Sequence, residues 1–138
     1  MKKVIGILLV LALCIPLAAC SSPGQIENVA ISIENSEKFS MPEIQSAIEV
    51  VKEKFQKDFQ NCVLIKIWYD PEESEPKEYT QAGGQEGSEN VIVLHSEFYV
   101  APHGADVSLN PDSTYPHWQW ILVRENADSP WVLEDSGY

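Results

Sequence analysis

Residues 40–59 read SMPEIQSAIEVVKEKFQKDF, and this stretch decides the fold because it combines a helix start with a helical repeat. Ser40 and Glu43 have the spacing of a capping box, in which each side chain bonds the backbone amide of the other. Pro42 is tolerated in the first turn of a helix. The pattern predicts a helix over residues 41–59. Its apolar stripe, which must pack on another element, consists of Ile44, Ala47, Ile48, Val51, Phe55 and Phe59.

Five further segments show the alternation of side chains that is typical of β-strands. In the second of them the alternation predicts one face made of four apolar side chains, Val63, Ile65, Ile67 and Tyr69. The last two segments are separated by turn-forming residues, so we expect them to form an antiparallel hairpin. The five segments span residues 28–34, 62–69, 90–101, 117–125 and 131–135.

Two stretches interrupt this pattern. Residues 70–89 are rich in acidic side chains and end in a glycine-rich run. A structureless loop of about 20 residues is uncommon in a compact domain, so we expect residues 75–81 to form a short helical turn. Residues 102–116 are rich in Gly, Asn, Asp, Ser and Pro, which favours a shaped loop between two strands.

The order of strand, helix and four strands predicts an α+β domain, with an antiparallel sheet of four to five strands curled around one long helix. Across most of residues 27–138 this order resembles the cystatin-like and NTF2-like architecture. The endings WQWILVR at 118–124 and WVLEDSGY at 131–138 resemble the C-terminal hairpin of small uncharacterised bacterial lipoproteins. The Gln-x-Val-x-Gly loop of cystatin inhibitors is absent, so the resemblance does not imply protease inhibition.

The N-terminus indicates where the protein is located. Lys2 and Lys3 precede an apolar run that ends at Leu17-Ala18-Ala19-Cys20, and this arrangement is typical of a secretory signal peptide. The last four residues resemble the lipobox of bacterial lipoproteins. The resemblance implies that the signal is cut before Cys20 and that the Cys20 thiol carries a diacylglycerol.

This interpretation divides the chain into a lipoprotein signal peptide at residues 1–19, a lipid-anchored tether at 20–26 and a single α+β domain at 27–138. The domain would be held at the cell membrane on its extracytoplasmic side, because two acyl chains on one residue anchor stably. An uncleaved membrane anchor and an ordinary secretory signal cut near Ala19 are the alternatives.

The chain is acidic, with 9 basic and 21 acidic residues. Loss of Lys2 and Lys3 with the signal leaves seven basic residues against the 21 acidic ones, a net charge of −14. This charge argues against nucleic acid as a partner, because phosphate binding needs a basic face. It also repels anionic headgroups and favours solubility.

Cys62 would be the only free thiol of the mature chain, since Cys14 lies in the signal and Cys20 would be acylated. No intrachain disulfide is then expected, so packing has to stabilise the domain. Cys62 opens an apolar run, which favours a buried structural cysteine over a nucleophile.

Candidate catalytic residues lie on the strand at 90–101, where His95, Glu97 and Tyr99 share one face. Residues two apart on a strand are separated by about 7 Å. At this separation His95 and Glu97 can share a proton network, as a base and its partner would. The alternative is that this face is simply the polar side of the sheet and meets water.

The loop at 102–116 carries oxygen ligands with calcium-type alternation. Pro111 stands where such a loop needs glycine, and His117 replaces the final glutamate. His103 and His117 flank the loop, but two histidines alone are weak evidence for zinc. We therefore expect no metal and no cofactor. The alternating ligands are Asp106, Ser108, Asn110 and Asp112.

The tryptophans and the single arginine are candidate ligand-binding residues. Trp118 and Trp120 share one face of their strand and are expected in the core, with a ligand platform as the alternative. Arg124 is expected to form a structural ion pair with Glu97 or Glu134, and anion recognition by its planar guanidinium is the alternative.

Together these patterns favour a lipid-anchored, extracytoplasmic binding or accessory module without catalytic activity, for a ligand that the sequence does not name. One alternative is a small pocket enzyme of NTF2-like architecture that uses His95 and Glu97. The other is a structural module that binds a protein partner at the cell surface through an exposed sheet edge. No GxSxG, P-loop or GxGxxG motif occurs in the chain.

Overall fold

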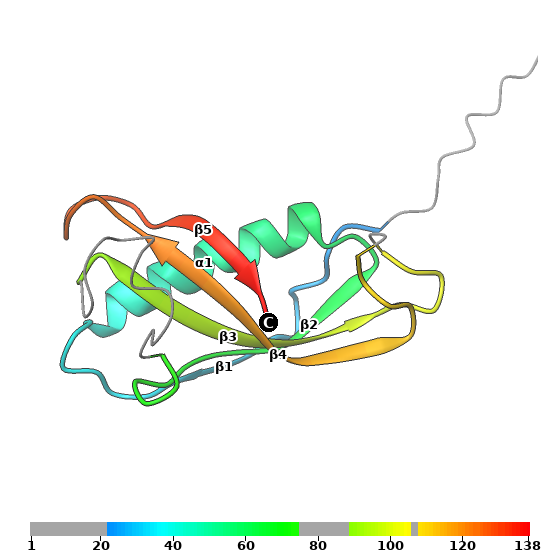
Figure 1. The fold of residues 1–138 in the computed structure, drawn as a ribbon, viewed down its shortest axis with the longest axis horizontal. Coiled ribbons are helices and arrows are strands. Elements are labelled where there is room, and N and C mark those ends of the chain that lie inside the picture. Colours follow the sequence, from blue (N-terminus) through cyan, green and yellow to red (C-terminus); the bar gives the residue numbers. More distant parts are fainter. Residues whose placement is uncertain (1–21, 75–88, 106–107) are drawn as a thin grey trace, which may run out of the picture.

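The computed structural model describes residues 22–74, 89–105 and 108–138, and these form one five-stranded sheet with one helix packed on it. The strands lie side by side in chain order (Figure 1). The prediction of an α+β domain is confirmed, whereas the helical turn expected at 75–81 lies outside the described residues. The elements are β1 (Ala30–Ile33), α1 (Met41–Asp58), β2 (Cys62–Tyr69), β3 (Val91–Val100), β4 (Ser113–Val123) and β5 (Val132–Gly137).

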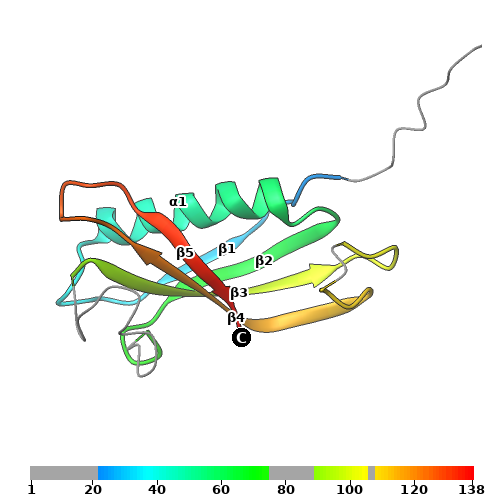
Figure 2. The same ribbon diagram turned by 45° about the horizontal axis from the view of Figure 1, so that its top comes forward.

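The sheet is mixed, so the expectation of an antiparallel sheet is wrong for its first strand. β1 pairs with β2 in parallel, and the other neighbouring pairs are antiparallel, including the predicted hairpin of β4 and β5. Parallel neighbours need a long crossover connection, and α1 lies between β1 and β2 in the chain. The helix therefore covers one face of the sheet, which we call the inner face (Figure 2).

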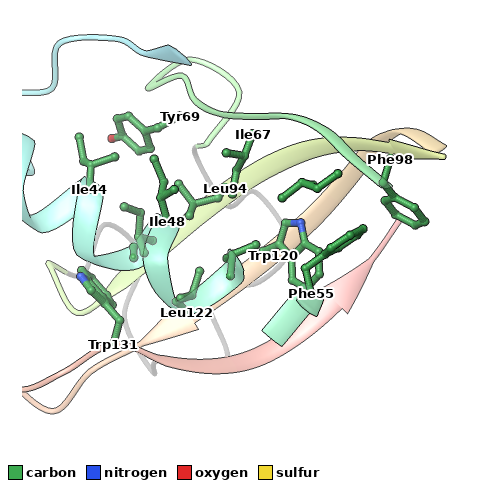
Figure 3. Close-up of a cluster of buried hydrophobic side chains, with 14 of the residues drawn as sticks. Ile44, Ile48, Phe55, Ile67, Tyr69, Leu94, Phe98, Trp120, Leu122 and Trp131 are labelled. Carbon is green, nitrogen blue, oxygen red and sulfur yellow. The ribbon is translucent and has the colours of Figure 1, made fainter. Parts of the chain in front are cut away.

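The core lies between α1 and the inner face (Figure 3). The predicted helical stripe is confirmed for α1, whose side chains at positions 44, 47, 48, 51 and 55 are buried. Trp120 is fully buried, and its Nε1 donates a hydrogen bond of 2.7 Å to Oγ of Ser96. This bond satisfies the one polar atom of a large buried ring. The sheet contributes Leu64, Ile67, Leu94, Phe98, Trp120 and Leu122 to this core.

A β-bulge in β2 decides which of its side chains reach the core. The register of β2 against β3 shifts between Leu64 and Lys66. An extra residue in a strand reverses the alternation beyond it. The predicted apolar face of β2 is therefore wrong, because Val63 and Ile65 are 36% and 39% exposed while Ile67 is buried.

β4 begins at Ser113, within the loop expected over residues 102–116, so that loop is shorter than predicted. The register of β4 against β3 shifts between Tyr115 and Trp118, which leaves Pro116 in the irregular stretch. Proline has no N–H to donate and is tolerated in a strand at such a bulge.

The described part of the tether expected at residues 20–26 is bonded to the domain. The N–H of Gly24 donates to the carbonyl of Gln56 at 3.0 Å, and the N–H of Asn61 donates to the carbonyl of Ser22 at 2.8 Å. Ser22 and Gly24 therefore belong to the folded unit.

The carboxylate of Glu43 joins the start of α1 to β4. Its Oε2 accepts the N–H of Ser40 at 2.6 Å and Ser40 Oγ accepts the N–H of Glu43 at 3.4 Å, which confirms the capping box. Its Oε1 lies 2.9 Å from Nη2 of Arg124. The hydrogen bonds from Ser40, with a smaller contribution from Arg124, lower the pKa of Glu43.

Arg124 lies immediately after β4, and its side chain is 3% exposed. Its Nε and Nη2 donate to the carbonyl of Glu89 at 3.1 Å and 2.8 Å, and its guanidinium lies 4.3 Å from the centre of the Trp131 ring. The expected ion pair with Glu97 or Glu134 is therefore wrong, because the curl of the sheet brings the end of β4 to the start of α1.

We expect Glu43→Gln to lower the free energy of unfolding by about 2 kcal/mol at neutral pH, because it leaves a buried guanidinium without its charged partner. Since the pKa of Glu43 is lowered in the folded state, this contribution is present at neutral pH and is lost as the pH falls through the folded pKa. Urea unfolding of wild type and variant, at about pH 7 and about pH 3, measures the difference.

The matched control is Glu49→Gln on the same helix, where an exposed carboxylate pairs with Lys52 at 3.0 Å. We expect this change to cost less than about 0.5 kcal/mol. Equal losses for the two variants at neutral pH would contradict a structural role for the Glu43–Arg124 pair.

Candidate functional site

The strongest candidate site is a hollow of about 400 Å³ on the outer face of the sheet, which is turned away from α1. We call it the outer groove. Four carboxylates and one lysine line it, so its charge is negative at neutral pH. The lining residues are Ser32, Glu34, Lys66, Trp68, Tyr69, Asp70, Glu73, Glu97, Pro116 and His117.

Trp68 is the central side chain of the outer groove. Its Nε1 donates to Oε2 of Glu73 at 3.0 Å, which fixes the ring against the turn that follows β2. Nζ of Lys66 lies 5.0 Å from the centre of the ring, and His117 meets the ring edge-on at 5.5 Å. His95 stacks on the ring with 5.8 Å between ring centres. The half-buried tryptophan thus has cationic, imidazole and carboxylate groups around it.

His95 is 3% exposed, and its buried Nδ1 has no hydrogen-bond partner among the described residues. Burial lowers the pKa of His95, because a charged imidazole would lose its hydration. His117 adds to this lowering, whereas the charges of Glu73 and Asp70 oppose it. His95 is therefore a neutral imidazole at neutral pH.

The three candidate catalytic residues do not converge. Across the sheet His95 pairs with Trp68 and Glu97 pairs with Lys66, and within the described residues no hydrogen bond joins His95 to Glu97. Tyr99 donates to Oδ1 of Asp112 at 2.5 Å, and this bond raises the pKa of Tyr99. Glu97 alone of the three lines the outer groove.

The calcium-type loop is used for turn contacts in its described part. The carboxylate of Asp112 accepts the Tyr99 hydroxyl, and the N–H of Asn110 donates to the hydroxyl of Tyr115 at 2.8 Å. Asp106 lies outside the described residues. In the described part of the chain no three His, Cys, Asp or Glu side chains converge as metal ligands.

The two flanking histidines are placed differently. His117 lies against Trp68 in the outer groove, whereas His103 is exposed in the turn after β3.

The candidate ligand-binding residues lie mostly in the structural framework. Trp120 is in the core, and Trp118 is half buried among aromatic rings that include Phe98 and Tyr138. In the part of the chain that the structure describes, the buried Nε1 of Trp118 has no hydrogen-bond partner. Arg124 borders a second hollow, of about 700 Å³, but its Nε and Nη2 already bond Glu43 and Glu89.

Cys20 and Cys62 differ in what can be described. Cys20, the expected lipidation site, lies outside the described residues. Cys62 is buried, and burial raises its pKa to about 11. A thiol with this pKa is almost entirely protonated at neutral pH and is therefore a poor nucleophile.

Sequence patterns alone did not identify the outer groove. The one indication of this site in the sequence is that Lys66 and Trp68 lie two residues apart and therefore share a face of β2. His95, His117 and Glu73 come from three other segments, and only the strand register brings them to Trp68.

Comparison with known proteins identifies no protein similar to this chain. No protein-family model matches the chain, and neither a curated protein nor a solved structure matches it. Within the described residues, α1 is too polar to be a membrane span.

We expect acidification from about pH 7 to about pH 5 to destabilise the fold partly through His95. Because its folded pKa lies below its unfolded pKa, the unfolded chain binds the proton first, and stability falls as the pH falls. Replacement His95→Leu should reduce this loss of unfolding free energy, whereas His103→Gln, at an exposed site, should leave it unchanged. Urea unfolding at the two pH values measures this loss of unfolding free energy. If His95→Leu loses as much as wild type does, His95 does not contribute to the pH dependence.

Proposed function

We propose that this chain is a lipid-anchored, extracytoplasmic binding module without catalytic activity, and that its ligand binds in the outer groove. The observation that carries the proposal is a half-buried tryptophan among four carboxylates in a hollow of about 400 Å³. Hollows of this size suit small molecules, and a few polar groups around an apolar surface provide specificity.

The charge of the outer groove favours a small ligand that carries a protonated amino group. Glu34, Asp70, Glu73 and Glu97 face a single ammonium, that of Lys66. Clefts lined by one sign of charge concentrate ions of the opposite sign. Lys66 already holds an ammonium over the Trp68 ring in a cation–π arrangement, and His95 stacks on the same ring. A ligand ammonium would therefore bind beside the ring, among the carboxylates.

The geometry favours binding over both alternatives. A pocket enzyme would need His95 and its carboxylate partner in hydrogen-bond reach, but no such bond joins His95 to Glu97 in the described part of the chain. A module that binds through a sheet edge would need a long exposed strand, and the two edge strands are short, since β1 spans four residues and β5 spans six.

We also propose that the domain belongs to the cystatin-like or NTF2-like architecture. A single long helix precedes the strands β2 to β5, which form an antiparallel meander around it. The parallel pairing of β1 with β2 is its departure from the expected pattern.

The ligand class can be tested with three five-carbon compounds that differ in charge: cadaverine, 1,5-pentanediol and glutarate. We expect only cadaverine to shift the NMR signals of the Trp68 indole N–H and the Lys66 amide in a saturable way. Glu97→Gln should weaken binding by up to about fivefold, because a partly exposed ion pair contributes up to about 1 kcal/mol. Glu53→Gln, on an exposed position of α1, is the control and should bind as wild type does.

Equal binding of the diol or of glutarate would refute the cationic ligand class. Signals shifted only outside the outer groove would refute the site.

The anchor can be tested by mass spectrometry of the protein from its native membrane. We expect a chain that begins at Cys20 and carries a diacylglycerol thioether, and we expect Cys20→Ser to keep residues 1–19. A free Cys20 thiol with the leader attached would contradict the anchor while leaving the groove proposal intact.

A further inference from the structure

Residues 22–25 are locked onto the domain where α1 ends and β2 begins. The N–H of Gly24 donates to the carbonyl of Gln56 at 3.0 Å. Two hydrogen bonds join Ser22 to Asn61. The N–H of Asn61 donates to the carbonyl of Ser22 at 2.8 Å, and the N–H of Ser22 donates to Oδ1 of Asn61 at 2.9 Å. The segment is therefore part of the folded body.

The close approach of this segment to α1 requires glycine. A Cβ added at Gly24 would lie 2.2 Å from the carbonyl oxygen of Phe55, a backbone atom that cannot swing away. Gly24 is buried, so the chain passes directly against the last turns of the helix.

Only Ser21 separates Cys20 from the first bonded residue, Ser22. Consecutive Cα atoms are 3.8 Å apart, so Ser22 lies within about 8 Å of the Cα of Cys20. A polar headgroup layer is only about 6 Å thick on each side of the hydrocarbon core. A lipid on Cys20 would therefore bring Ser22 to the membrane surface.

The outer groove lies toward the other end of the domain. Ser22 bonds Asn61, and Nδ2 of Asn61 donates to the carbonyl of Gly104 at 3.1 Å, so these residues share one end, which we call the anchor end. From there β2 runs away to Trp68, about 20 Å from Cys62 at the usual rise of a strand. Figure 1 shows the blue start of the described chain beside the C-terminal end of α1, and the turn after β2 toward the other end of the domain.

The basic residues are also distributed toward the anchor end. Three of the seven basic residues of the mature chain, Lys52, Lys54 and Lys57, lie in the second half of α1. Lys54 and Lys57 are exposed. Lys52 and Lys54 pair with Glu49 and Asp58, and Lys57 lies in the last turn of the helix. In a chain with net charge −14, these lysines lower the repulsion between this end and anionic headgroups.

We propose that the anchor end rests on the headgroup layer in a fixed orientation, and that it holds the outer groove about 20 Å from the membrane, open to the aqueous phase. This inference rests on the proposed lipid at Cys20. The partner of the anchor end is the lipid surface itself, and residues 22–25 act as a rigid mount rather than as a flexible tether.

The orientation can be tested without natural acylation, on a chain that begins at Cys20. All described elements follow Cys20, so this chain contains the whole core. Cys62 is buried with a pKa of about 11, so a maleimide-headgroup lipid couples selectively to Cys20 at neutral pH. The coupled protein is placed on nanodiscs that contain a nitroxide-headgroup lipid, and NMR records the line broadening of each amide.

We expect strong broadening of the amides of Asn61 and Gly104 and at least fivefold weaker broadening of those of Trp68 and Glu73. Insertion of a flexible twelve-residue Gly-Ser segment between Ser21 and Ser22 should remove this difference. Gly24→Ala, which should release the mount from α1, should reduce it.

Equal broadening at both ends of the parent protein would overturn the fixed orientation, as would an unchanged pattern after the insertion. The insertion precedes the bonded residues and should not disturb folding. It therefore tests the fixed orientation even if Gly24→Ala does not fold. Because the lipid is coupled chemically, a negative result refutes the orientation alone, and mass spectrometry of the native protein decides the anchor separately.

Discussion

The fold depends on one shared carboxylate. Glu43 closes the capping box that starts α1, and the same side chain holds Arg124 at the end of β4. Arg124 in turn bonds the carbonyl of Glu89, just before β3, and packs on Trp131, just before β5. A buried guanidinium is tolerable only when its donors are satisfied. Helix start, sheet curl and hairpin position are therefore coupled in one cluster.

This cluster also explains why the two faces of the sheet have different roles. It draws α1 onto the inner face, where the helical stripe and the strand side chains exclude water. The outer face carries a smaller apolar cluster of Val91, Val93 and Ile121 together with polar side chains, and there Trp68 and its neighbours form the outer groove. The bulge in β2 contributes to this difference, because it places Ile67 on the inner face and Lys66 and Trp68 on the outer face.

The proposed ligand site and the proposed membrane-facing end are connected by the same strand. β2 begins beside the residues that bond Ser22 and ends at the turn that carries Glu73. A chain bonded at one end of a stiff sheet presents its other end at a defined height. In the proposed orientation the acidic groove would be kept away from the lipid surface, whose negative charge would compete for a cationic ligand.

Local signals were enough to predict α1 and the strand at 62–69, because a capping box and a side-chain period act within a few residues of the chain. They also correctly predicted Trp120 in the core and Cys62 as a buried thiol. The bulge was not predicted, because nothing in the sequence of β2 marks an extra residue before it meets β3. Local signals also could not show that β1 would run parallel to β2.

What the sequence determined by itself was therefore the set of elements, since each follows from the spacing of side chains along a short segment. The tertiary structure alone decided the partner of Arg124 and the meeting of Trp68, His95, His117 and Glu73. These contacts join residues far apart in the chain. They depend on strand register and on the curl of the sheet, which arise from packing of the whole domain rather than from any one segment.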